Sequence, residues 1–266
     1  MGGRSVDARG LVRKASKAAL TPLGWPGRRR PGDVVILLYH RVGASPSEIE
    51  VPAATFAEHL KHLADKGRLL TLDEVASGTH TGGVAVTFDD GTPDFHETVL
   101  PLLVDHRVPT HLYLATGLVA NGGPRSAEGL TWSQLAEAVS TGLVTVGSHT
   151  HSHADLSRAG GTEAEEEMWR SKELIEDRLG VACEHFAYPW GVGSPAADRA
   201  ARRLFRTAAL DAWRINRAGR IDAHRLGRVP ILRSDGSFFF RRKVNGQLDT
   251  EAWLYRALGR GPWRRR

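Results

Sequence analysis

The chain has 266 residues, of which 41% are hydrophobic and 25% charged, and its formal net charge is +6. This length suits one large α/β domain or two small ones, and the composition is that of an ordinary globular protein. A single cysteine, Cys183, excludes an internal disulfide and a cysteine-rich metal site. The positive charge comes largely from arginines at residues 28–30 and 264–266. We interpret these runs as solvated tails. No nucleic-acid partner is expected, and weak contact with an anionic surface stays open.

Apolar segments with the length of strands alternate with helical segments along the chain. The predicted strands are Val34–His40, Val84–Asp90, Thr110–Thr116, Leu143–His149, His185–Trp190, Leu204–Leu210 and Arg228–Leu232. This alternation predicts a parallel sheet of α/β class and, at this length, a closed or nearly closed β/α barrel. The barrel domain is expected over residues 32–245. A basic flexible segment is expected at 1–31, and a C-terminal helix with a basic tail at 246–266.

Four capping boxes mark expected helix starts, at Thr55 with Glu58, Thr71 with Glu74, Thr131 with Gln134, and Thr162 with Glu165. The main predicted helices span 55–66, 96–106, 131–140, 162–179, 196–203 and 250–258. The helix at 55–66 is amphipathic, and His59 and His62 are expected on its surface.

The strand VAVTFDDG, residues 84–91, ends on two adjacent carboxylates and a glycine. Asp89 and Asp90 therefore fall at the carboxyl end of a buried strand, where parallel barrels carry their chemistry. Neighbouring carboxylates repel unless a positive group lies beside them, so a divalent metal is predicted, with one aspartate as ligand and the other free to move a proton. The alternative is a pair of aspartates that caps the next helix.

Three histidines follow another predicted strand in the segment SHTHSHADL, residues 148–156. Neutral imidazoles bind zinc and similar metals, and histidines four residues apart can face one point. We predict His149 and His153 as ligands together with Asp90, and His151 as turned elsewhere. Three protein ligands leave the open position that a catalytic metal needs, and zinc is the favoured ion.

With TFDDG at 87–91, HTHSH at 149–153 and FAYPWG at 186–191, each after a predicted strand, the chain resembles the polysaccharide deacetylases with a NodB homology domain, carbohydrate esterase family 4. The resemblance runs from about Val34 to Leu232. It implies a distorted seven-stranded barrel and metal-dependent removal of acetyl from an N-acetylated sugar.

The resemblance also implies roles for individual residues. Asp89 would be the general base, and Asp90, His149 and His153 the ligands. The groove wall would include Tyr188, Pro189 and Trp190, with the Trp190 N–H at the oxyanion and its ring stacked on sugar.

Two features depart from the best-known pattern of the family. Ala187 stands where that pattern has an arginine that pairs with the catalytic aspartate, and the late L-x-H histidine has no counterpart near Ile231–Ser234. The branch with FAYP, which includes poly-N-acetylglucosamine deacetylases, shares the first absence and uses an early YH histidine. We therefore predict His40 as general acid, the alternative being a strand-end histidine bonded to backbone. Arg228 is predicted to replace the missing arginine.

Two other functions remain compatible with these residues: an amide or imide hydrolase for a small non-sugar substrate, and a weakened barrel that only binds glycans. Residues 11–25 are interrupted by Arg13, Lys14, Lys17 and Pro22, so no cleavable signal peptide is expected. A cytoplasmic location is favoured, and association with the cell envelope stays open.

Overall fold

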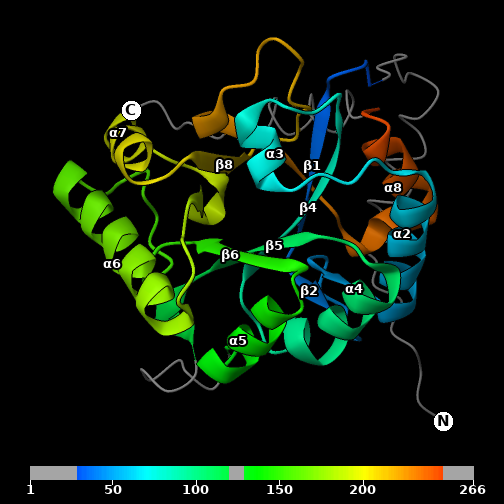
Figure 1. Cartoon of the computed structure of the whole chain (residues 1–266), viewed down its shortest axis with the longest axis horizontal. Coiled ribbons are helices and arrows are strands. Elements are labelled where there is room, and N and C mark those ends of the chain that lie inside the picture. Colours follow the sequence, from blue (N-terminus) through cyan, green and yellow to red (C-terminus); the bar gives the residue numbers. More distant parts are fainter. Residues whose placement is uncertain (1–28, 120–128, 248–266) are drawn as a thin grey trace.

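Seven parallel strands close into a barrel in the computed structural model, which describes residues 29–119 and 129–247 (Figure 1). The strands are β1 (Val34–Tyr39), β4 (Gly83–Asp90), β5 (Thr110–Leu114), β6 (Val144–Ser148), β7 (His185–Ala187), β8 (Thr207–Asp211) and β9 (Leu226–Pro230). They lie in sequence order, and β9 pairs with β1 to complete the ring. The predicted seven-stranded β/α barrel is therefore confirmed. The barrel is distorted, because β6 and β7 share one residue pair only.

Helices surround this barrel (Figure 1). They are α2 (Ala53–Lys66), α3 (Leu72–Ser77), α4 (Leu100–His106), α5 (Trp132–Ser140), α6 (Gly161–Leu179), α7 (Pro195–Leu204) and α8 (Gly236–Val244). Two short strands, β2 (Arg41–Val42) and β3 (Glu50–Val51), pair beside β1. In Figure 1, α6 and α7 lie together on one flank, and α2 and α8 on the other. No helix in the described ranges is both long and apolar enough to cross a membrane.

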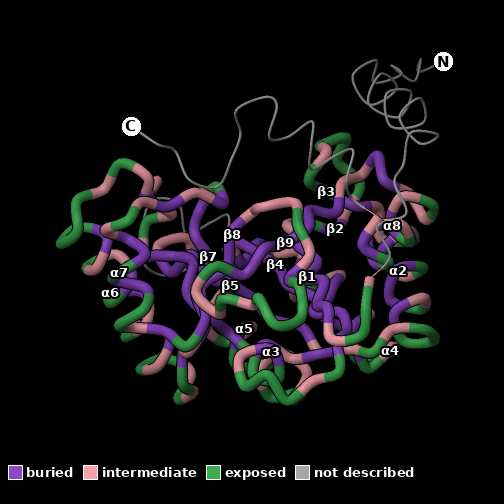
Figure 2. The backbone as a smooth tube through the Cα atoms, turned by 90° about the horizontal axis from the view of Figure 1, so that it is seen from above, coloured by how far each residue is buried: buried purple, intermediate pink, exposed green. Residues whose placement is uncertain are grey.

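Side chains alternate in direction along each strand and so divide the core into two layers. Figure 2 shows that buried residues fill the middle of the molecule. On β4, Val84, Val86 and Phe88 pack in the layer beneath the helices, whereas Ala85 belongs to the smaller inner cluster. Asp89 has the same parity as Ala85 and so continues the inward series. On β9, Arg228 has the same parity as the inward-facing Leu226 and likewise points into the barrel. The alternation thus directs two charged side chains into the barrel.

Two helices begin elsewhere than their capping boxes predict. The α2 helix starts at Ala53, behind Pro52, so Thr55 lies inside its first turn. In α6 the cap is Gly160, and the Glu163 carboxylate accepts from its N–H at 3.4 Å. Glu165 instead pairs with Arg203 of α7, at 2.7 Å. Contacts with neighbouring elements therefore override a local capping signal. The boxes at Thr71 and Thr131 are confirmed.

Other predicted elements differ at their ends. The segment 96–106 consists of a π-helical turn, Phe95–Val99, followed by α4. Pro101 near the start of α4 lacks the N–H of a regular helix, which accounts for the wider turn before it. Strand β7 stops at Ala187, and Pro189–Gly191 form a 3-10 turn.

The α8 helix was not predicted, and one of its contacts corrects a prediction about α2. His59 is 1% exposed, stacks on Phe240 of α8 and bonds Tyr39 Oη through Nδ1 at 3.1 Å. The expectation that His59 lies at the surface is wrong. The predicted helix at 250–258 and most of both predicted tails lie outside the described residues.

Candidate active site

Strand β4 delivers both aspartates to the carboxyl end of the barrel. Asp89 is buried at 3% exposure, and Asp90 follows it with a left-handed backbone, φ 75°. Gly91 also has positive φ, 84°, and a Cβ there would press against Leu114 Cδ1. The backbone conformation at this position therefore favours glycine. The tight turn directs the two neighbouring carboxylates into one site, although successive strand residues normally face opposite sides.

The histidine loop follows β6. His149 lies at the strand end, with its N–H bonded to Leu114 O at 2.9 Å. Its Nδ1 lies 2.8 Å from Ala187 O, and since a carbonyl only accepts, Nδ1 carries the proton. The Nε2 atom is therefore the lone-pair nitrogen. Burial lowers the pKa of His149 to about 4, despite the nearby Asp89 and Asp90, so the ring is neutral at neutral pH.

Three potential ligand atoms, one each from Asp90, His149 and His153, lie within 4.8 Å of one another. His153 Nε2 is 3.3 Å and His149 Nε2 is 3.8 Å from Asp90 Oδ1. That oxygen is buried and accepts no hydrogen bond of regular geometry from the described residues. A carboxylate oxygen thus faces the lone pair of His149, an arrangement that a cation would stabilise. The donor set suits zinc and similar divalent ions.

Arg228 lies across the barrel from this group and holds Asp89 by two bonds. Its Nη1 is 2.5 Å from Asp89 Oδ1, and its Nη2 is 2.8 Å from Oδ2. Burial opposes ionisation of Asp89, but Arg228 and then His149 more than offset it, so the pKa of Asp89 lies below its ordinary value. The Arg228 guanidinium lies over the Tyr113 ring at 5.2 Å. Asp89 is therefore a fixed, ionised acceptor, with Oδ2 3.6 Å from His149 Nε2.

His40 follows β1 and is half-buried. It is close enough to both carboxylates for its charge to lower the pKa of Asp89 and of Asp90. Burial opposes ionisation of Asp90, but the nearby His153, His149 and His40 more than offset it, so the pKa of Asp90 lies below its ordinary value. The structure thus brings His40 to the same end of the barrel as the predicted base and ligands.

Of the three predicted groove residues, only Trp190 presents its ring to solvent. It is 67% exposed, and its ring meets that of His153 edge-to-face at 5.0 Å. Its backbone is left-handed, φ 60°, and its N–H donates to no other described residue. Tyr188 and Pro189 are buried, and Tyr188 packs on Phe186. Their side chains support the turn that carries Trp190.

Sequence reasoning assigned no role to Tyr113 or Asp211. Tyr113 of β5 points inward, because it pairs in register with Asp89 of β4 and belongs to the inner cluster. Asp211 ends β8, and burial raises its pKa to about 7, partly offset by Arg228. A Cβ on Gly191 would clash with the Cβ of Asp211, so Asp211 packs directly against the turn that carries Trp190.

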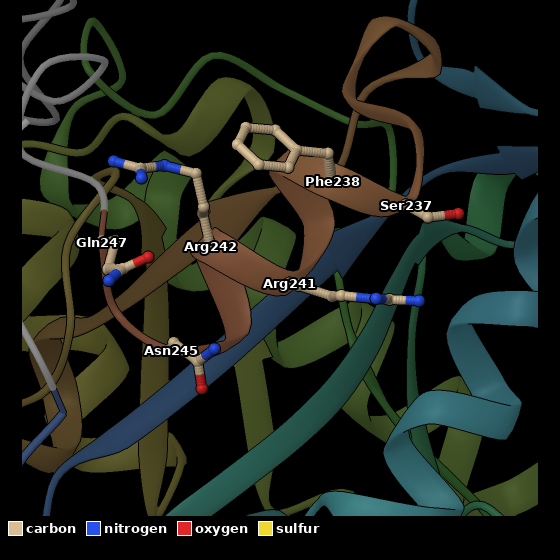
Figure 3. A pocket seen from close by; sticks show the side chains of 6 residues that line it. All are labelled: Ser237, Phe238, Arg241, Arg242, Asn245 and Gln247. Atoms are coloured by element: carbon tan, nitrogen blue, oxygen red, sulfur yellow. The ribbon is translucent and has the colours of Figure 1, made fainter. Parts of the chain in front are cut away.

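A separate hollow of about 420 Å³ lies along α8 (Figure 3). It is lined by Ser237, Phe238, Arg241, Arg242, Asn245 and Gln247. In Figure 3 the Arg242 chain extends on the same side as the Phe238 ring, whereas Arg241 points away. None of these residues belongs to the Asp90–His149–His153 group.

Comparison with known proteins identifies the family. The family model for polysaccharide deacetylases matches residues 76–209, about half of the chain. The chain belongs to the polysaccharide deacetylase family. The stretches at 87–91, 149–153 and 186–191 all lie within the matched region, and they supply most of the site described above.

Two curated relatives of this polysaccharide deacetylase family member are also named as deacetylases. A chitooligosaccharide deacetylase of Sinorhizobium fredii is 32% identical over 120 residues, covering 44% of this chain and 51% of its own. A poly-beta-1,6-N-acetyl-D-glucosamine N-deacetylase of Staphylococcus aureus is 23% identical over 192 residues, covering 61% and 66%. The matches thus span about half to two thirds of the length of these two relatives.

A solved structure shares the fold over nearly its whole length. The Streptococcus pyogenes deacetylase PplD, in complex with acetate, superposes with a TM-score of 0.73 at 26% identity. The match covers 81% of this chain and 99% of that one. The barrel described here is therefore the fold of a deacetylase of known structure.

Proposed function

We propose that the protein is a metal-dependent hydrolase that removes N-acetyl groups from an acetamido sugar or polysaccharide. The observation that carries this proposal is the convergence of Asp90, His149 and His153 within 4.8 Å, beside a second carboxylate held by Arg228. Family membership supports the reaction class. Residues 32–245 would form the catalytic domain.

Each group would have a distinct role. A divalent metal ion held by Asp90, His149 and His153, with zinc favoured, would acidify a bound water and polarise the acetamide carbonyl. Asp89 is ionised and fixed, so it would accept the proton of the attacking water. Arg228 would hold that carboxylate in one orientation. The Trp190 N–H is available as a donor to the developing oxyanion.

The departing amine needs a proton, because an amide anion is a poor leaving group. His40 is the proposed acid, since it lies at the carboxyl end of β1 near both aspartates. His149 is unsuited to this role because its Nδ1 proton is bonded to Ala187 O.

The exposed Trp190 ring favours a sugar substrate, because an aromatic face packs against the apolar face of a pyranose. The named substrates of the two curated relatives are N-acetylated glucosamine oligomers and polymers, and the acetate bound to PplD is the product expected of deacetylation. We therefore propose N-acetylglucosamine-containing glycans as substrates.

Acetate release from N-acetylglucosamine oligomers tests the proposal, with a cyclic ureide as the alternative substrate. We expect release from the oligomers only, loss of release on chelation, and recovery with Zn²⁺. The His149→Ala variant should lose metal and activity together. Turnover of the ureide alone, or activity that survives complete metal removal, would refute the proposal.

A further inference from the structure

The histidine loop, residues 149–153, is held in an unusual backbone conformation. Thr150 and His153 have left-handed backbones, φ 65° and 59°, and neither is glycine. A β-branched residue such as Thr150 rarely adopts positive φ. The loop must therefore be fixed by contacts from outside itself, because its own sequence does not favour this shape.

One side of the loop is held by the turn after β5. His151 Nδ1 lies 2.9 Å from Thr116 Oγ1, and Gly117 N–H donates to His151 O at 2.7 Å. These bonds turn His151 away from the Asp90–His149–His153 group, although it lies between two members of that group in sequence.

The other side is held by Glu167 of α6. Its Oε2 accepts from the N–H groups of His151 at 3.0 Å and Ser152 at 2.8 Å, and its Oε1 accepts from Ser152 Oγ at 3.0 Å. The His151 N–H is shared with the Glu167 backbone carbonyl, at 3.1 Å. The next residue, Met168, is fully buried, which fixes this turn of α6 on the core.

We infer that Glu167 is a positioning residue that presets the histidine loop for metal binding. Its carboxylate binds two successive N–H groups directly before His153, and so fixes where the His153 ring projects toward Asp90. Ligands whose supporting bonds are removed typically lose metal affinity 10–100-fold, because the loop must then be ordered by the metal itself. This inference rests on the proposed metal-dependent function.

Three variants of the full chain separate this role from general stability. Glu167→Ala removes the side-chain acceptors, whereas Glu167→Gln retains an amide oxygen that can accept from both N–H groups. Glu166→Ala removes a neighbouring exposed carboxylate and serves as the matched control. Zn²⁺ affinity is measured by competition with a chromophoric chelator, and site geometry by the absorption spectrum of the Co²⁺-loaded protein.

We expect Glu167→Ala to bind Zn²⁺ about tenfold or more weakly than wild type and to show an altered Co²⁺ spectrum. Glu167→Gln should restore most of the affinity, and Glu166→Ala should match wild type. Zn²⁺ affinity within twofold of wild type for folded Glu167→Ala, with an unchanged Co²⁺ spectrum, would overturn the inference but leave the proposed function intact. A wild-type protein that binds no divalent metal would overturn both.

Discussion

Arg228 and Asp89 form a two-point ion pair inside the barrel, although 139 residues separate them in the sequence. Both side chains are almost completely buried, at 1% and 3% exposure. Ala187 stands where the resemblance places an arginine beside the catalytic aspartate. We propose that Arg228 of β9 takes the place of that arginine, because its guanidinium binds both oxygens of Asp89.

Replacing Arg228 with methionine should strongly destabilise the protein, because Asp89 would remain as a buried unpaired charge. We expect the free energy of unfolding, measured in urea, to fall by about 3–5 kcal/mol. The double variant Asp89→Leu with Arg228→Met should recover much of that loss. Arg203→Met, in an exposed pair with Glu165, should cost no more than about 1 kcal/mol. Equal losses for Arg228→Met and Arg203→Met would contradict this view.

Replacing Asp89 with asparagine preserves shape but removes the proton acceptor. Acetate release should fall at least about 100-fold, the usual range for a lost general base. Zinc content should remain near that of wild type, because Asp90, His149 and His153 are untouched. Turnover close to wild type would assign the base to another group.

Trp190→Ala should weaken binding of glycan oligomers, because the exposed ring is removed. A stacking loss of about 1 kcal/mol raises KM roughly fivefold. Trp190→Gly should raise KM equally but be the more stable of the two, since glycine accepts φ 60° without strain. Trp169→Ala, in which an exposed ring of α6 is removed, is the control. If Trp169→Ala raised KM as much, the effect would not be specific to this site.

The burial of His59 should make the folded protein less stable in acid. Burial lowers its pKa in the folded protein to about 4, from 6.5 when unfolded. The unfolded chain therefore binds the extra proton first, and the stabilisation present above pH 6.5 is lost as the pH falls toward 4. When the pH falls from 7 to 5, this histidine should lower the free energy of unfolding by about 2 kcal/mol. The fall in unfolding free energy over that range should be smaller by this amount in His59→Gln. An identical fall would show that His59 does not contribute.

The barrel and most of the site could be predicted because their signals are local. Each chemistry-bearing group directly follows an apolar strand, and a parallel barrel brings strand ends together whatever the loops do. The conformation of the histidine loop could not be predicted, because it depends on Glu167 and Thr116, which are remote in sequence. The same holds for the pairing of Arg228, which depends on the register of β9.

Errors in the predicted elements have similar causes. The box of Thr162 with Glu165 fits a capping pattern, but Glu165 bonds Arg203 and the helix starts one residue earlier. The α8 helix was missed because its three consecutive phenylalanines do not show the spacing of an amphipathic helix. In the structure Phe238 is exposed, whereas Phe240 is buried against His59.

Zinc-edge anomalous diffraction from crystals grown with Zn²⁺ tests the central claim most directly. The account predicts one strong peak about 2.0–2.2 Å from an Asp90 carboxylate oxygen and from Nε2 of His149 and His153. His151 should remain bonded to Thr116 in the same crystals. Absence of a peak among these three side chains, or a zinc ion held by other residues instead, would contradict it.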